Sequence, residues 1–222
     1  MAEQDLGAAW DELVASSLRR ASTTASASGC VPMRLSSRPR RHYSPTKPRE
    51  VGLIPTALRA TLRVLVRGEG RWPLLVWGPP GTGKTCAGLC LLDFAGGLHF
   101  TASSLAEAAL LATKGQLLSP SGRAVPAGAF WDEVRTAALV VLDELALREK
   151  VSDWHYDQVK RVIDDREGRP LVVLSNMDPQ QIARLYDDRI ASRLAGGTVV
   201  CLDGPDRRLA PGGRSWPLSD PV

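Results

Sequence analysis

The sequence predicts a three-layer α/β fold built on a five-stranded, mostly parallel sheet. Two observations predict it. Short, continuously apolar runs such as LLVW and PLVVLSN are typical of parallel strands that are buried on both faces. Segments with helical periodicity alternate with these runs, and such alternation predicts parallel strands joined by helices. With 222 residues, 44% of them hydrophobic, the chain is long enough for one domain of this kind with a substantial core.

The N-terminal part of the chain is expected to lie outside this sheet. Residues 3–20 carry apolar side chains at helical spacing, acidic residues near the start and arginines at the end, which predicts a helix. This helix (1–20 as a unit) either docks on its own domain or, as we favour, binds a partner protein. Residues 21–50 are rich in Ser, Ala, Pro and Arg and predict a flexible basic linker. Its basic part, 30–50, is either solvated or a contact for nucleic acid phosphates.

Residues 51–204 are expected to form the α/β domain, beginning with a helix over 52–67. Strands are expected at 74–77, 98–101, 138–144, 170–176 and 197–203. Further helices are expected from the glycine-rich loop to about Asp93, over 103–114 behind a serine N-cap, over 130–137, over 153–166, and over 179–194 with a break near Asp187. Residues 115–128 predict a loop. Residues 205–222 predict an irregular tail in which no C-terminal lid domain fits.

The composition excludes several classes of protein. Four cysteines (Cys30, Cys86, Cys90 and Cys201) form no CxxC pair, and with three histidines no zinc spacing can be assembled. We expect reduced, mostly buried thiols. No apolar run approaches the ~20 residues of a membrane span, and the N-terminus lacks a signal-peptide pattern. We therefore expect a cytoplasmic protein without membrane contact. The net charge of +4 hints at a polyanionic partner.

The strongest motif is GPPGTGKT, a full match to G-x-x-x-x-G-K-[ST] between a predicted strand and a predicted helix. Glycines let such a loop wrap closely, so that its N–H groups and the helix N-terminus face phosphates. The lysine is expected to reach the β and γ phosphates of ATP, and the threonine to bind Mg²⁺. The predicted nucleotide-binding residues are Gly78, Pro79, Pro80, Gly81, Thr82, Gly83, Lys84 and Thr85.

Two later strands end in polar residues at the edge where open α/β sheets bind ligands. ALVVLDE ends in Asp143, expected to hold Mg²⁺, and Glu144, expected to act as the general base for water. PLVVLSN ends in Asn176, which we expect, rather than Ser175, to orient that water. A carboxylate directly after the magnesium ligand favours hydrolysis of ATP over phosphoryl transfer to a small molecule.

DDRIASRLAGG places Arg189 and Arg193 on a short helix before the last strand. An arginine that reaches a neighbouring subunit's γ phosphate can accelerate hydrolysis by ~10³–10⁵. The alternative is a helix-surface charge that pairs with Asp187 or Asp188. The spacing alone does not choose between these interpretations or between the two arginines.

GPPGTGKT, VVLDE, VVLSN and DRIASRL, in this order and spacing, resemble the AAA+ ATPases of the DnaC/DnaA branch, and most of all the DnaC-type replicative helicase loaders. The resemblance covers residues from about 50 to 203. It implies sensor-1 and trans-acting arginine-finger roles for Asn176 and Arg193. It also implies an inserted helical segment within 104–137 that arranges subunits and helps line a DNA channel. Arg207 and Arg208 do not match a sensor-2 position.

The resemblance implies an ATP-dependent loader that self-associates with its active site at subunit interfaces and binds single-stranded DNA and a hexameric replicative helicase. Residues 1–20 would then be a minimal helicase-binding element. An IstB-type transposition helper has the same core and differs in its partner. A small-molecule kinase would need a lid and is disfavoured by Glu144. A nucleotide-binding adaptor without turnover is disfavoured by the intact Lys84, Thr85, Asp143 and Glu144.

Overall fold

The computed structural model describes residues 41–42, 54–146 and 150–206. The expected helix over 3–20, most of the expected linker and the expected tail beyond Asp206 lie outside the described residues. The elements are, in chain order, β1 (Arg41–His42), α2 (Thr56–Val66), β2 (Leu74–Trp77), α3 (Lys84–Ala95), β3 (Leu98–Thr101), α4 (Ala102–Thr113), α5 (Ala127–Thr136), β4 (Val140–Leu145), α6 (Asp153–Asp165), β5 (Leu171–Ser175), α7 (Pro179–Leu185), α8 (Asp188–Ala195) and β6 (Thr198–Cys201).

The strands form one parallel sheet in the order β1-β3-β4-β5-β2-β6. The five strands predicted from the sequence are all present, so the α/β class is confirmed. The sheet has one further, two-residue strand: Arg41–His42 pairs with β3 at the sheet edge, inside the segment expected to be only a linker. Within the described residues, no helix follows β6.

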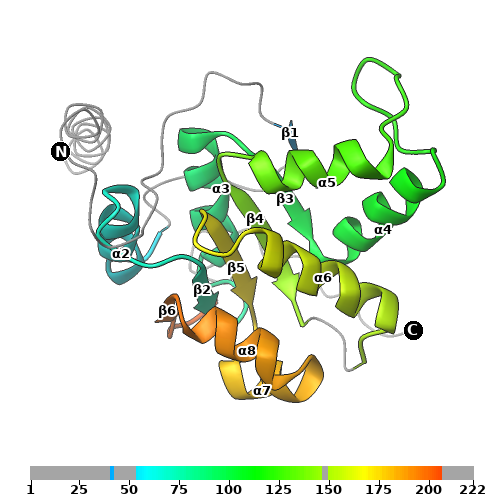
Figure 1. Ribbon diagram of the computed structural model, residues 1–222. Coiled ribbons are helices and arrows are strands. Elements are labelled where there is room, and N and C mark those ends of the chain that lie inside the picture. Colours follow the sequence, from blue (N-terminus) through cyan, green and yellow to red (C-terminus); the bar gives the residue numbers. More distant parts are fainter. Residues whose placement is uncertain (1–40, 43–53, 147–149, 207–222) are drawn as a thin grey trace, which may run out of the picture.

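The helices cover both faces of the sheet, which gives the three layers (Figure 1). Alternate residues of each strand point to opposite faces. Leu74 and Val76 of β2 pack with α2 and α3, whereas Leu75 packs with the layer of α4 to α8. Apolar side chains are buried on both faces of the sheet: Leu58 of α2 and Val159 of α6 are fully buried. Each parallel strand is therefore apolar on both faces, as its continuous hydrophobic run predicts.

Helix boundaries follow from local capping groups. α4 starts at Ala102, because Thr101 accepts a hydrogen bond from the Ser104 amide while the Ser104 hydroxyl accepts one from the Thr101 amide. The expected serine N-cap, two residues further on at Ser103, is therefore wrong. The break near Asp187 is confirmed: α7 ends at Leu185, and Asp187 caps α8 by accepting from the Ile190 amide at 2.7 Å.

The segment between α4 and α5 is more ordered than the expected loop. Leu118 and Ala124 form an antiparallel bridge, and the Ser119 amide donates to the Arg123 carbonyl oxygen at 2.8 Å. This short hairpin projects beyond the body of the domain (Figure 1). Leu118 is 61% exposed on it. None of the helices in the described ranges is long and apolar enough to cross a membrane.

Candidate functional site

The glycine-rich loop connects β2 to α3 and owes its shape to its glycines. Gly78, Gly81 and Gly83 have φ values of 144°, 75° and 95°, which side chains rarely adopt. A Cβ atom on Gly78 would also lie 2.0 Å from the carbonyl oxygen of Leu202. The loop therefore packs against the segment that follows β6, and it opens directly onto the first turn of α3.

Lys84 is the first residue of α3 and is 8% exposed. Its Nζ donates to the carbonyl oxygens of Gly78 and Pro79, at 2.7 Å each. Thr82, also buried, donates its hydroxyl to the same Pro79 oxygen at 2.9 Å. A positively charged group is thus held inside the loop at the positive end of a 12-residue helix. This arrangement favours an anion such as a phosphate at the loop.

Asp143 lies near the end of β4, one strand over from β5 and two from the phosphate-loop strand. It is 3% exposed. Burial raises the pKa of its carboxyl group, but the nearby His99 and Thr85 side chains and the Glu144 amide outweigh this and hold the pKa below the ordinary value of 3.8. The Glu144 amide donates to Asp143 Oδ1 at 2.8 Å. The structure therefore places Thr85 and Asp143, predicted as magnesium ligands, near each other and keeps Asp143 ionised.

His99 is a neighbour of Asp143 that the sequence interpretation missed. It lies on β3, is 2% exposed, and its Nε2 is 3.6 Å from Asp143 Oδ2. That separation is beyond direct hydrogen-bond length. Among the described residues, neither ring nitrogen of His99 has a hydrogen-bond partner. Asp143 Oδ2 has none among them either. An ionisable residue inside the apolar run LHFT is the signal that could have drawn attention to His99.

Glu144 has a backbone conformation that is rare for a side-chain-bearing residue, with φ of 56°. It lies where the pairing of β4 with β5 shifts register between Leu142 and Leu145, a bulge that re-aims side chains. Its side chain lines a cavity of about 310 Å³ between the starts of α4 and α6 and the end of α7. Lys150, His155 and Tyr186 line the same cavity. Adjacent carboxylates thus occupy different surroundings, Asp143 beside α3 and Glu144 facing this cavity.

Ser175 ends β5 and joins three strands at the sheet edge. Its hydroxyl donates to the Leu145 carbonyl oxygen at 2.9 Å and accepts from the Met177 amide, and its own carbonyl oxygen accepts from the Gly78 amide at 3.3 Å. Asn176 follows directly and is exposed. The structure therefore puts Asn176 next to the start of the phosphate loop, while the buried hydroxyl of Ser175 has a structural partner.

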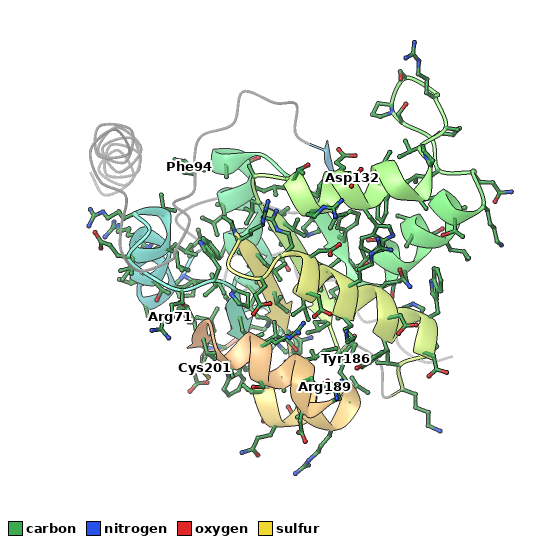
Figure 2. The ribbon with its side chains drawn as sticks, in the orientation of Figure 1. Arg71, Phe94, Asp132, Tyr186, Arg189 and Cys201 are labelled. Atoms are coloured by element: carbon green, nitrogen blue, oxygen red, sulfur yellow. The ribbon has the colours of Figure 1, made fainter. Side chains whose placement is uncertain are left out.

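In the isolated chain, Arg193 of α8 pairs with a residue of α6 that is not one of the predicted site residues. Its Nη1 forms an ion pair with Asp164 Oδ1 of α6, and Asp164 Oδ2 also accepts from Lys160 Nζ at 2.7 Å. The side chain of Arg193 is 43% exposed. Arg189 is exposed at the start of α8, and Figure 2 shows it near Tyr186 at the turn between α7 and α8. Within one chain, Arg193 therefore pairs with an acid of another helix, Asp164, and not with the expected alternative partners Asp187 or Asp188.

Asp206 is a second residue that the sequence interpretation missed. A Cβ atom on Gly81 would lie 1.7 Å from Asp206 Oδ1, so the carboxylate lies directly against the phosphate loop. An acid shortly after the last strand carries no recognisable motif, so only the folded chain shows this contact.

The oxygen atoms at this edge fit Mg²⁺ held together with phosphates. Mg²⁺ is usually bound by one or two carboxylates plus substrate phosphates rather than by an all-protein cage. Asp143 and Thr85 offer a carboxylate and a hydroxyl oxygen side by side. In the ranges that the structure describes, no group of three or more His, Cys, Asp or Glu could hold a metal alone. Of the cysteines described there, Cys86 and Cys90 are buried as expected, and Cys201 is exposed.

The strand order puts β5 between the phosphate-loop strand β2 and the Asp143 strand β4, with all their carboxyl ends at one edge. This arrangement and the loop geometry define a P-loop α/β domain. No family model matches the chain, and no curated protein sequence matches it.

Solved structures with this fold include the DnaC helicase loader, which aligns with 18% identity over 73% of this chain and 96% of its own, at a TM-score of 0.52. Domain III of the Thermotoga maritima replication initiation protein DnaA aligns with 19% identity over 72% of this chain and 70% of its own chain, at a TM-score of 0.51. A DNA replication initiation factor aligns with 19% identity over 66% of this chain, at a TM-score of 0.54. The aligned part spans only 45% of that protein. These likenesses show that the chain shares its three-layer α/β fold with these replication proteins.

Proposed function

We propose that this chain is an ATP-hydrolysing switch that loads a hexameric replicative helicase onto single-stranded DNA. The observation that carries the ATPase part is the meeting of three groups at one sheet edge. A buried lysine lies inside a glycine loop, a buried carboxylate lies near the threonine that follows that lysine, and the carboxylate of the next residue lines a cavity. No structural purpose of the fold requires all three.

In this proposal each residue has a defined task. Lys84 and the loop N–H groups hold the phosphates, exchanging the lysine's bonds to Gly78 and Pro79 for bonds to phosphate oxygens. Thr85 and Asp143 hold Mg²⁺, which neutralises charge on the phosphates. Glu144 removes the proton of the attacking water, and Asn176 orients that water. A neighbouring copy's Arg193 completes the site, for which it must leave its own Asp164.

The helicase and DNA part of the proposal has two supports. The fold extends over nearly the whole of the solved DnaC helicase loader, 96% of that chain. In addition, two helices, α4 and α5, lie between β3 and β4, where the resemblance implies an inserted helical segment. ATP binding would bring copies together and favour binding of DNA and helicase, and hydrolysis would release the helicase. Slow turnover suits such a switch.

Fluorescence anisotropy tests this function with a labelled oligothymidine in the presence of ATP, ADP or no nucleotide. We expect binding at least about ten-fold tighter with ATP, which corresponds to about 1.4 kcal/mol of coupling. Lys84→Ala should abolish the difference in oligothymidine affinity between the samples with ATP and without nucleotide. The thermal unfolding of this variant should stay cooperative. Equal oligothymidine affinity of the wild-type protein with and without nucleotide would contradict the proposal that ATP acts as a switch. A pull-down with purified replicative helicase then tests the partner.

A further inference from the structure

The positive charge of this chain is concentrated in one region. Residues 38–71 contain nine Lys or Arg and two Glu, a net charge of +7, although the whole chain carries only +4. The remainder of the chain is therefore net negative, at −3. The small net charge of the whole chain thus includes one strongly basic segment. A polyanion attracted to this protein would be attracted to that segment.

The described part of that segment arranges its arginines in a row. Arg59, Arg63 and Arg67 follow one another at four-residue intervals along α2 and its C-cap, about 6 Å apart along the axis, and Arg71 continues the interval beyond the helix. We call these four residues the arginine row. Arg63, Arg67 and Arg71 are exposed, and Arg59 is partly so. Figure 2 shows Arg71 at the outer edge of the molecule, between α2 and β6.

The row has no acidic partners in the described structure. None of the ion pairs between described residues involves these arginines. Glu69 is the sole acid between residues 54 and 71, and it is exposed. Arg63 and Arg67 lie near the C-terminus of α2, where positive charge stabilises a helix. That effect does not extend to Arg59, in the first turns, or to Arg71, beyond the helix.

The packing of α2 decides which polyanion suits the row. A basic helix that binds a membrane surface must insert its apolar face into the lipid. The apolar face of α2 is already used: Leu58, Leu62 and Leu65 are at most 1% exposed, and they pack on the core beside β2 and α3. What remains available is a line of guanidinium groups, which suits a phosphate backbone.

We propose that the arginine row is the main phosphate-contact surface of this protein for single-stranded DNA. The choice of single-stranded DNA rests on the proposed function. The row lies on the α2 side of the sheet, so it is separate from the α4–α5 insertion on the opposite face, where the resemblance implies a DNA channel.

The double variant Arg63→Gln/Arg67→Gln tests this in the full-length protein, with labelled oligothymidine and a potassium chloride series. Each phosphate contact on a single strand contributes about 0.7 to the slope of log affinity against log salt. We therefore expect the slope to fall by about 1.4, and the affinity at 0.1 M salt to fall about twenty-fold. Arg63→Lys/Arg67→Lys should keep most of the affinity, because lysine retains the charge.

Arg169→Gln/Arg184→Gln is the matched control, since it removes the same charge from exposed positions in the turn between α6 and β5 and on α7. It should leave both slope and affinity within about two-fold of wild type. An equal loss in the control, no loss in the row variant, or a wild-type protein that does not bind the oligonucleotide would each overturn the proposal. The ratio of the wild-type affinities with ATP and with ADP separately tests the switch, so failure of the arginine row and failure of the switch give different results.

Discussion

At the scale of single residues, Glu144 combines a strained backbone with a proposed chemical role. Its φ of 56° lies in the left-handed region, which costs a side-chain-bearing residue roughly 1–2 kcal/mol. The neighbouring Ala146 shares this feature at φ 65°. Such strain persists where the surrounding structure holds the residue in position, and it is often found at functional sites. The bulge in β4 thus points Glu144 into the cavity at the expense of some stability.

Glu144→Gln should bind ATP with near wild-type affinity and lose at least about a hundred-fold in hydrolysis, because the amide cannot accept the proton of water. Phosphate release and fluorescent-nucleotide titration measure the two properties. Normal turnover in this variant would remove Glu144 as the base.

Glu144→Gly separates strain from chemistry. Glycine adopts positive φ without steric cost, so the free energy of unfolding should be unchanged or rise by up to about 1 kcal/mol. Hydrolysis should still be lost. Urea unfolding of the two variants checks this, and a large destabilisation by glycine would mean that the Glu144 side chain supports the fold.

At the scale of elements, α8 is attached to α6 by polar contacts. Tyr156 of α6 donates its hydroxyl to Asp187 Oδ2 at 2.5 Å, and the ion pair between Arg193 and Asp164 lies at the other end of α8. The Tyr156 and Tyr186 rings also stack, with centroids 6.5 Å apart. The position of Arg193 therefore depends on how α8 is capped and paired.

Arg193→Ala should bind ATP yet lose turnover, and mixing it with Lys84→Ala should restore part of the activity if Arg193 acts in a neighbouring copy. Asp164→Asn is the matched control, because it breaks the same ion pair but leaves the arginine. Its turnover should equal or exceed that of wild type. If both variants lose the same stability and the same activity, Arg193 has a structural role within its own chain.

Asp187→Ala should lower the free energy of unfolding by about 1 kcal/mol, because α8 loses its N-cap. Asp187→Asn keeps a capping oxygen and should lose less. The Ile190 amide, followed by the Tyr156 hydroxyl, holds the pKa of Asp187 below its ordinary 3.8 in the folded protein. The carboxylate therefore stabilises the fold above that pH, and this contribution is lost as the pH falls through the folded value.

Urea unfolding at about pH 6 and about pH 3 measures this linkage. The difference between wild type and Asp187→Asn should be largest at the higher pH and shrink at the lower. A difference that grows on acidification would mean that Asp187 is not stabilised as a carboxylate.

At the scale of the whole molecule, the proposed ATPase site is drawn from residues between 78 and 193, whereas the helix expected over 3–20 lies outside the described residues. Deletion of residues 1–20 should leave ATP hydrolysis within about two-fold, because every residue assigned to the proposed site lies in the α/β domain. It should abolish capture of purified helicase in a pull-down. Retained capture would mean that the helicase-binding element lies elsewhere in the chain.

Local sequence was sufficient to predict most of the elements and the chemical character of the site. Continuous apolar runs predicted the five longer strands, because a strand buried on both faces needs no polar alternation. The phosphate loop was recognisable because Lys84 and its glycines are neighbours in sequence as well as in space. Arg41–His42 could not be predicted as a strand, because these two polar residues form no apolar run and only their pairing with β3 makes them a strand.

Local sequence by itself determined the α/β class, the phosphate loop and the acidic end of β4, because each depends on residues within a few positions of one another. Tertiary structure alone decided the strand order, the proximity of Thr85 and Asp143, the positions of His99 and Asp206, and the pairing of Arg193 with Asp164. These contacts join segments that are far apart in the chain. Their geometry is set by how the helices pack on the sheet, which no local pattern encodes.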